Sequence, residues 1–131
     1  MLSGYKYYNY LIAEYNYIHN KYEISTIFKD KIGGIKMITN NLLIKLKNND
    51  QESIEKARNT LLSMKGKIES LKDIRVEADV RKGNYDIMLI TKYDSLEGLD
   101  AYLIDPVHVE VAKYIGSVLE SQASLCYESI D

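Results

Sequence analysis

The stretch YDIMLITKY, residues 85–93, has apolar side chains on both of the faces that an extended chain presents. Successive side chains of a strand point to opposite sides, so Ile87 and Leu89 share one face while Met88 and Ile90 share the other. A strand that is half in water alternates apolar and polar residues, and this one does not. We therefore predict a strand whose two faces are both covered by protein.

The segments on either side complete an α+β pattern. Period-two alternation predicts further strands at residues 37–47, 73–80 and 122–130. Helical spacing predicts a helix from an Asp50 cap to about Ser70, a short helix capped by Ser95, and another opened by Pro106. Between residues 80 and 85, Gly83 and Asn84 are suited to the positive φ of a hairpin turn. The order is β-α-β-β-α-β, a ferredoxin-like four-stranded antiparallel sheet with its helices on one face.

Helices on one side leave the second face of such a sheet uncovered. That face carries apolar residues of the first and third strands, and a small domain rarely leaves an apolar patch of this size in water. A second copy of the same sheet is the natural cover. We therefore expect a homodimer in which two sheets face each other as an α/β barrel.

Composition and charge exclude several classes of protein. The 131 residues are 46% hydrophobic and 27% charged, as in one ordinary globular domain. A formal charge of −2 argues against nucleic-acid binding, which requires a basic face. The sequence shows neither a bilayer-spanning run nor a secretory signal, so we expect a cytoplasmic protein without a membrane partner. The domain has one histidine and scattered carboxylates, so we expect no metal site and no cofactor.

Residues 1–36 differ in composition from the rest of the chain. They hold seven of the twelve tyrosines and the one phenylalanine, among many Lys, Asn and Ile residues. Codons for GGIKM, residues 33–37, fit a ribosome-binding sequence followed by a start codon. We therefore expect residues 1–36 to be an extension, either a translated leader or a detached helix, and residues 37–131 to be the domain. A genuine amphipathic helix that packs on the domain is the alternative, because apolar residues recur at three- and four-residue steps.

Several motifs in residues 37–130 resemble the stress-responsive α/β-barrel (Dabb) domain family. They are LLIKLK on the first strand, YDIMLITKYDSLEGLDAY from the third strand into its helix, DPVHVEVAKY, and the closing CYES. The most specific element is the spacing of a tyrosine, an Asp-Pro pair and a histidine between Tyr102 and Val109. The resemblance implies the β-α-β-β-α-β fold and a face-to-face homodimer.

The same motif places a histidine at a helix N-terminus. Asp105 is suited to the N-cap and Pro106 to the first helical position, where a missing N–H costs nothing. His108 then lies in the first turn, where the helix dipole disfavours positive charge, so we expect a neutral imidazole that can act as a base. Tyr102 lies on the apolar side of the preceding helix. We predict that Pro106 fixes a corner that directs both side chains into the space between helices and sheet.

The resemblance also implies a role for this pair. Plant polyketide cyclases of the family use a histidine and a tyrosine at matching positions in a cofactor-free ring closure, which makes His108 a candidate general base and Tyr102 its partner. Asp105 and Asn40 stand where some members carry further histidines. We expect the pair to line a pocket for a small apolar molecule, with further contacts from Asn40, Leu42, Leu89, Leu99 and Val111. Two alternatives stay open: catalysis of this kind, or a non-catalytic structural stress protein in which the pair fills a packing corner.

Overall fold

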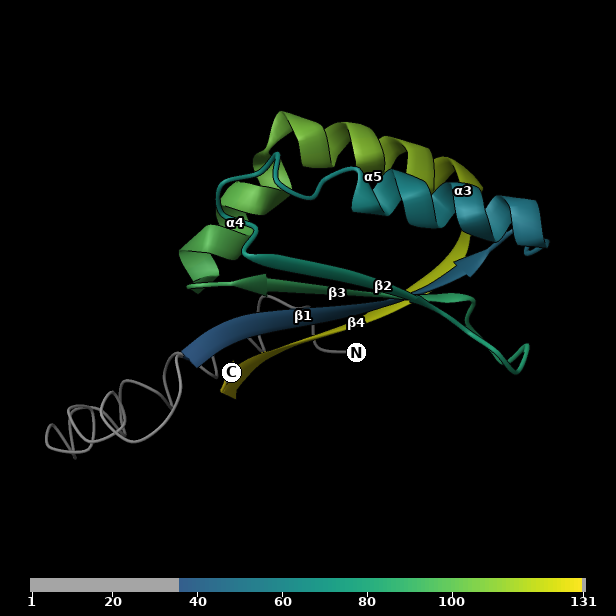
Figure 1. The fold of residues 1–131 in the computed structure, drawn as a ribbon, viewed down its shortest axis with the longest axis horizontal. Coiled ribbons are helices and arrows are strands. Elements are labelled where there is room, and N and C mark those ends of the chain that lie inside the picture. Colours follow the sequence, from purple (N-terminus) through teal and green to yellow (C-terminus); the bar gives the residue numbers. More distant parts are fainter. Residues whose placement is uncertain (1–35, 131) are drawn as a thin grey trace, which may run out of the picture. The chain divides into compact units, whose positions relative to one another are not determined.

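The computed structural model describes residues 36–130, and the predictions made for residues 1–35 lie outside this range. Within the described range the elements are β1 (Lys36–Leu46), α3 (Gln51–Leu62), β2 (Asp73–Ala78), β3 (Ile87–Tyr93), α4 (Leu96–Ile104), α5 (Pro106–Val118) and β4 (Leu119–Ile130). The strands form one antiparallel sheet in the order β2-β3-β1-β4. The three helices of this range lie on one face of it (Figure 1). The predicted α+β, ferredoxin-like fold is confirmed, with α4 and α5 together forming its second helical unit.

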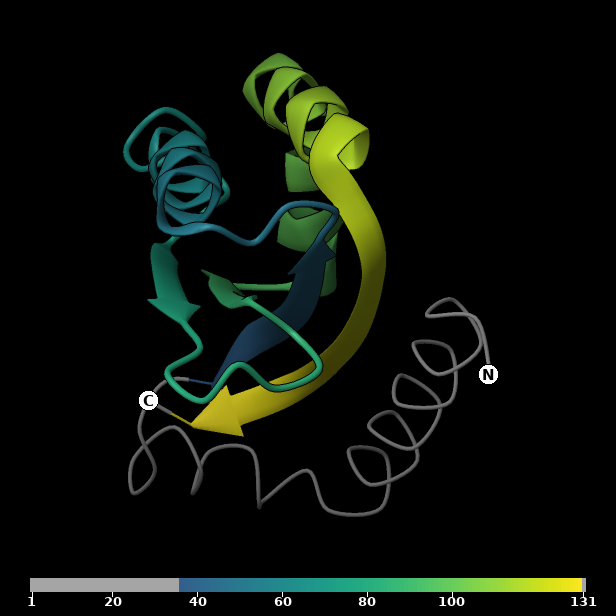
Figure 2. The same cartoon turned by 90° about the vertical axis from the view of Figure 1, so that its right-hand side faces the viewer.

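Strand β3 has the two-faced character that its sequence predicts. Every second residue from Ile87 to Tyr93 is buried, and the residues between them are half-buried. The antiparallel register sets Leu42 opposite Leu89 and Ile44 opposite Ile87, so the buried side chains of β1 and β3 point to the same side. Seen from the side, the helices cover this face, and the long β4 curves along the sheet (Figure 2).

The hydrophobic core fills the space between this face and the helices. Aliphatic side chains from all four described strands and the three helices enclose it, and burial of that apolar area is the main stabilising term of the fold. Its fully buried members are Ile44, Ala57, Met64, Ile87 and Tyr93 among others. The core therefore places a tyrosine, and not only aliphatic residues, at the end of β3.

Helix α3 ends earlier than its apolar spacing suggests. The prediction of a helix to about Ser70 is wrong, because α3 ends at Leu62 with Ser63 as its C-cap. Gly66 follows with φ 77°, a left-handed conformation that glycine adopts without strain and that ends helices. The apolar spacing continues beyond the helix because Met64 and Ile68 are buried from the turns that follow it.

The connection between β2 and β3 also differs from its prediction. It spans residues 79–86, and the residue with positive φ is Lys82, at 54°, not Gly83 or Asn84. The loop instead closes around a carboxylate, since Asp79 Oδ2 accepts a hydrogen bond from the Gly83 N–H at 2.7 Å. This bond and others from neighbouring backbone N–H groups hold the pKa of Asp79 below its usual value.

None of the helices in the described part of the chain has the length and apolar character needed to cross a membrane.

Candidate functional site

A sharp corner between α4 and α5 sets the geometry of the site. Asp105 ends α4 and caps α5, with an extended backbone at φ −63° and ψ 133°. Its Oδ1 accepts a hydrogen bond from the Val107 N–H at 2.8 Å, and Pro106 occupies the first turn of α5. The predicted N-cap and proline positions are confirmed, and they place His108 in the first turn.

His108 is held by a hydrogen bond from its own ring. Its Nδ1 lies 3.0 Å from the carbonyl oxygen of Leu103, in the last turn of α4. A carbonyl oxygen only accepts, so Nδ1 carries the proton and, in the neutral imidazole, Nε2 keeps a free lone pair. The Nε2 atom is therefore the one available to accept a proton or a hydrogen bond from a ligand.

The ring of the buried Tyr102 packs against the ring of His108. The two ring centroids lie 4.3 Å apart with the planes inclined by 43°. Tyr102 is 4% exposed, and its hydroxyl donates to the sulfur of Met64 at 3.8 Å. Burial raises the pKa of Tyr102 to about 12, because a phenolate would lose its hydration there. The hydroxyl therefore remains a neutral donor at physiological pH.

This raised pKa predicts how stability changes in alkali. In the unfolded chain Tyr102 ionises at about pH 10, whereas in the folded protein it ionises at a higher pH. The stabilisation that the neutral, buried Tyr102 gives the folded state is therefore complete below about pH 10. We expect the free energy of unfolding to fall as the pH rises from about 10 toward 12, and to fall less steeply in Tyr102→Phe. Urea unfolding at a series of pH values measures both slopes. Equal slopes for the two proteins would contradict the burial argument.

The other predicted contacts lie on the same side of the sheet as the pair. In the register of β1 and β3, Asn40 lies opposite Thr91 and Leu42 opposite Leu89, which places both on the helix-covered face. Leu99 of α4 and Val111 of α5 belong to the same buried cluster as Tyr102 and Leu89, with Leu42 packed at its edge and Asn40 half-buried. Whether these side chains contact a ligand stays a prediction.

Two residues near the pair were not predicted as part of the site. One is Met64, the acceptor for Tyr102. The other is Tyr93, whose ring centroid lies 5.2 Å from that of Tyr102 with the planes inclined by 57°. Tyr93 has the same strand parity as Leu89, so period-two alternation could have found it. The apolar spacing after Asp50 includes Met64 and predicts its burial, but it does not predict the contact with Tyr102, because the turn that carries Met64 follows the end of α3.

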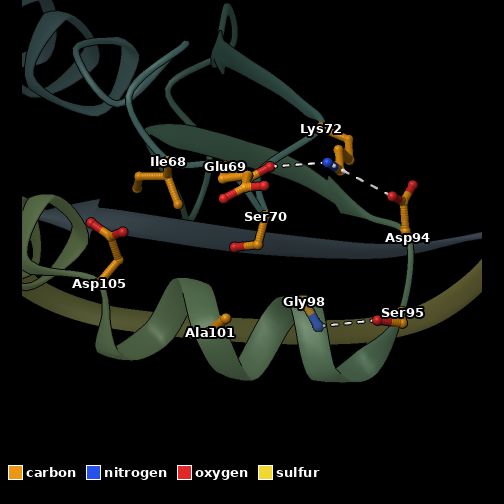
Figure 3. Close-up of a pocket in the computed structure, with 9 residues that line it drawn as sticks. All are labelled: Ile68, Glu69, Ser70, Lys72, Asp94, Ser95, Gly98, Ala101 and Asp105. Carbon is orange, nitrogen blue, oxygen red and sulfur yellow. Dashed lines mark hydrogen bonds and ion pairs between the residues drawn. The ribbon is translucent and has the colours of Figure 1, made fainter.

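A surface pocket of about 370 Å³ lies beside α4. Gly98 and Ala101 of α4, with its N-cap Ser95, form one wall, and residues 68–70 with Lys72 form the other (Figure 3). The Lys72 side chain links two residues at the edge of the pocket. Its Nζ donates a hydrogen bond to the Glu69 carbonyl oxygen at 3.0 Å and lies 3.8 Å from Asp94 Oδ2. The residues that line it are Ile68, Glu69, Ser70, Lys72, Asp94, Ser95, Gly98, Ala101 and Asp105. None of the predicted site residues lines it.

No three His, Cys, Asp or Glu side chains within residues 36–130 lie close enough together to hold a metal ion.

Several solved structures have a fold similar to that of this chain. The chain resembles a dimeric ferredoxin-like protein of unknown function from Bacteroides fragilis, with 23% identity, a TM-score of 0.63, and coverage of 71% of this chain and 96% of that one. A dimeric ferredoxin-like protein from Thermobifida fusca gives 22% identity, a TM-score of 0.63, and coverage of 70% and 90%. Hydroxynitrile lyase from Passiflora edulis gives 14% identity, a TM-score of 0.64, and coverage of 72% and 94%. No curated protein matches the chain significantly.

These likenesses establish the fold, and the sequence establishes the family. The profile of the stress responsive A/B barrel domain matches residues 38–129, which is most of the chain and contains every element described above except the first residues of β1 and the last of β4. The chain therefore belongs to the stress-responsive α/β-barrel (Dabb) domain family.

Proposed function

We propose that this domain binds a small, mostly apolar molecule between the sheet and the α4–α5 corner, with His108 and Tyr102 contacting its polar group. The observation that carries the proposal is the hydrogen bond from His108 Nδ1 to the Leu103 carbonyl, which leaves Nε2 as an acceptor on a ring whose centroid lies 4.3 Å from that of the buried Tyr102. An apolar surrounding with a few oriented polar groups is typical of small-molecule sites. Leu42, Leu89 and Val111 would supply the apolar contacts.

A second candidate function is cofactor-independent proton transfer. The fixed tautomer favours it, because a base must present a lone pair and Nε2 has one. In such a reaction His108 would take a proton from a carbon next to a carbonyl, and the Tyr102 hydroxyl would donate to the oxygen that gains negative charge. That a hydroxynitrile lyase has a similar fold supports the capacity of this architecture for an active site.

A non-catalytic structural role is the third candidate. Two observations support it: the His108 ring lies in close, tilted contact with that of Tyr102, and neither residue lines the pocket beside α4. In this reading the hydrogen bond to the Leu103 carbonyl only satisfies a half-buried imidazole.

We also propose that two copies associate through the sheet face opposite the described helices, in the cytoplasm. On that face Leu43 lies opposite Met88 and Asn41 opposite Ile90, and the Asn41 side chain donates to the Tyr127 hydroxyl at 3.3 Å. Apolar residues on the two inner strands of the sheet suit a sheet-to-sheet contact. The dimeric state of the similar proteins from Bacteroides fragilis and Thermobifida fusca supports this arrangement.

Substitutions at the pair test the ligand-binding proposal. A thermal-shift screen of small hydroxy-substituted aromatic ketones should find compounds that raise the melting temperature of the wild type by mass action, because their O–H can donate to Nε2 and their carbonyl can accept from Tyr102. We expect His108→Asn to weaken binding about tenfold, because its amide nitrogen can still donate to the Leu103 carbonyl while the Nε2 acceptor is lost. Tyr102→Phe should weaken binding by about fivefold, through loss of one donor.

The fold of each variant is checked by circular dichroism and by melting without ligand. If an activity is found, His108→Asn should lower it by about 100-fold or more, as expected for removal of a general base. Unchanged affinity and activity in both variants would leave the structural role as the correct one.

A further inference from the structure

Tyr93 is a buried polar residue that the proposed site does not yet use. The side chain is 0% exposed, at the end of β3, on the face that the helices cover. Its hydroxyl has no hydrogen-bond partner among the described residues, although it is fully buried. Burying a hydroxyl without a partner is unfavourable, and native proteins retain such groups for a reason, often a bound water or a functional role.

The groups around this hydroxyl are also poorly satisfied. Tyr102, whose ring lies 5.2 Å away, donates to the sulfur of Met64, which is a weak acceptor. Thr91, on the same face of β3, has its hydroxyl 3.5 Å from the Asn40 carbonyl, at the limit of a hydrogen bond. The hydroxyls of Thr91 and Tyr102 lie near enough to that of Tyr93 to influence its pKa through weak hydrogen bonding, but neither forms a hydrogen bond of good geometry with it. Two phenolic hydroxyls therefore share a region in which neither donates to a carbonyl or carboxylate oxygen of the described residues.

We propose that the Tyr93 hydroxyl, together with that of Tyr102, donates to an oxygen atom of the ligand, so that Tyr93 selects molecules with a carbonyl or phenolate oxygen. This inference rests on the proposed function, since it names the class of ligand for the same site. It assigns Tyr93 a role in specificity, while His108, whose ring also lies against Tyr102, supplies an acceptor.

The chemistry of the two phenols fits this role. Burial raises the pKa of Tyr93, and the nearby Tyr102 and Cys126 add to the effect, so both tyrosines stay protonated and keep a hydrogen to donate. A single ligand oxygen has lone pairs for two donors, and a buried site with two oriented donors strongly rejects an analogue that lacks the acceptor. Cys126 offers only a weak sulfur acceptor and would not replace that oxygen.

A matched pair of probes tests the inference. Acetophenone and α-methylstyrene have nearly the same shape, but only the ketone has an oxygen acceptor. We expect the wild type to bind acetophenone about tenfold more tightly than α-methylstyrene, as measured by ligand-observed NMR titration. In Tyr93→Phe this preference should fall to near unity, with the affinity for α-methylstyrene unchanged, because the ring and its packing are kept.

Two controls separate specificity from structure. Tyr114→Phe removes a hydroxyl from a half-buried tyrosine of α5 whose ring contacts Lys56, and it should keep the tenfold preference. Without ligand, Tyr93→Phe should melt at the same temperature as the wild type or higher, because the lost hydroxyl had no partner. A clearly lower melting temperature would overturn the inference without any ligand, since it would show that the hydroxyl is bonded in the free protein.

The remaining outcomes distinguish the inference from the proposed function. If Tyr102→Phe loses the ketone preference while Tyr93→Phe keeps it, the binding site stands and the role of Tyr93 is wrong. If the wild type binds both probes equally, a ligand site exists but the tyrosine hydroxyls do not recognise the ligand oxygen, which also overturns the inference. If the wild type binds neither probe, the proposed function fails and the inference falls with it.

Discussion

Replacing Met88 with aspartate is expected to convert a dimer into a monomer or to unfold the protein. Met88 lies near the start of β3, an inner strand of the sheet, opposite Leu43 of β1, on the face that we propose to contact a second copy. An aspartate there would bury an unpaired charge in the contact between the sheets, which costs several kcal/mol. Since dimer formation contributes to folding, the loss should appear in both mass and stability.

Sedimentation equilibrium at micromolar concentration measures this effect. The wild type should give twice the monomer mass of 15.1 kDa, and Met88→Asp should give the monomer mass or an unfolded chain. Val80→Asp is the matched control, because Val80 is 93% exposed in the loop between β2 and β3. A fully folded Met88→Asp dimer would show that the two faces of the sheet have been assigned the wrong way round, and a monomeric wild type would rule out the barrel.

Replacing Asp86 with alanine is expected to destabilise the domain by about 3 kcal/mol. Asp86 is 5% exposed, and its Oδ2 accepts a hydrogen bond from the Leu46 N–H at 2.8 Å. Its Oδ1 accepts a second one from the Asn49 amide at 3.3 Å. Alanine would leave the buried Leu46 N–H without a partner and would release the loop between β1 and α3.

Urea unfolding at one fixed protein concentration measures this loss, with Asp86→Asn as the matched variant. Asparagine keeps an oxygen for the Leu46 N–H, so we expect it to cost about 1 kcal/mol, less than alanine. Equal stabilities of the alanine variant and the wild type would show that the carboxylate does not hold the loop.

The sequence by itself determined the order of the elements and the corner that carries the candidate site. Alternation along β3 predicted which residues face the helices, and Asp105 with Pro106 predicted the start of α5. These features depend on local rules, namely the period of a strand and the chemistry of a helix cap, so neighbouring residues suffice to predict them. The resemblance to the Dabb family, carried by local motifs, was confirmed over residues 38–129 for the same reason.

Tertiary structure alone decided how the polar groups of the site are satisfied. The tautomer of His108 depends on the Leu103 carbonyl, and the Tyr102 hydroxyl depends on Met64, which is 38 residues away in sequence. Local sequence likewise missed the early end of α3 and the positive φ of Lys82, since packing of the turns after α3 and the Asp79 carboxylate set them. Hydrogen bonds need atoms within about 3 Å and well aligned, and only the packed chain fixes which distant atoms meet.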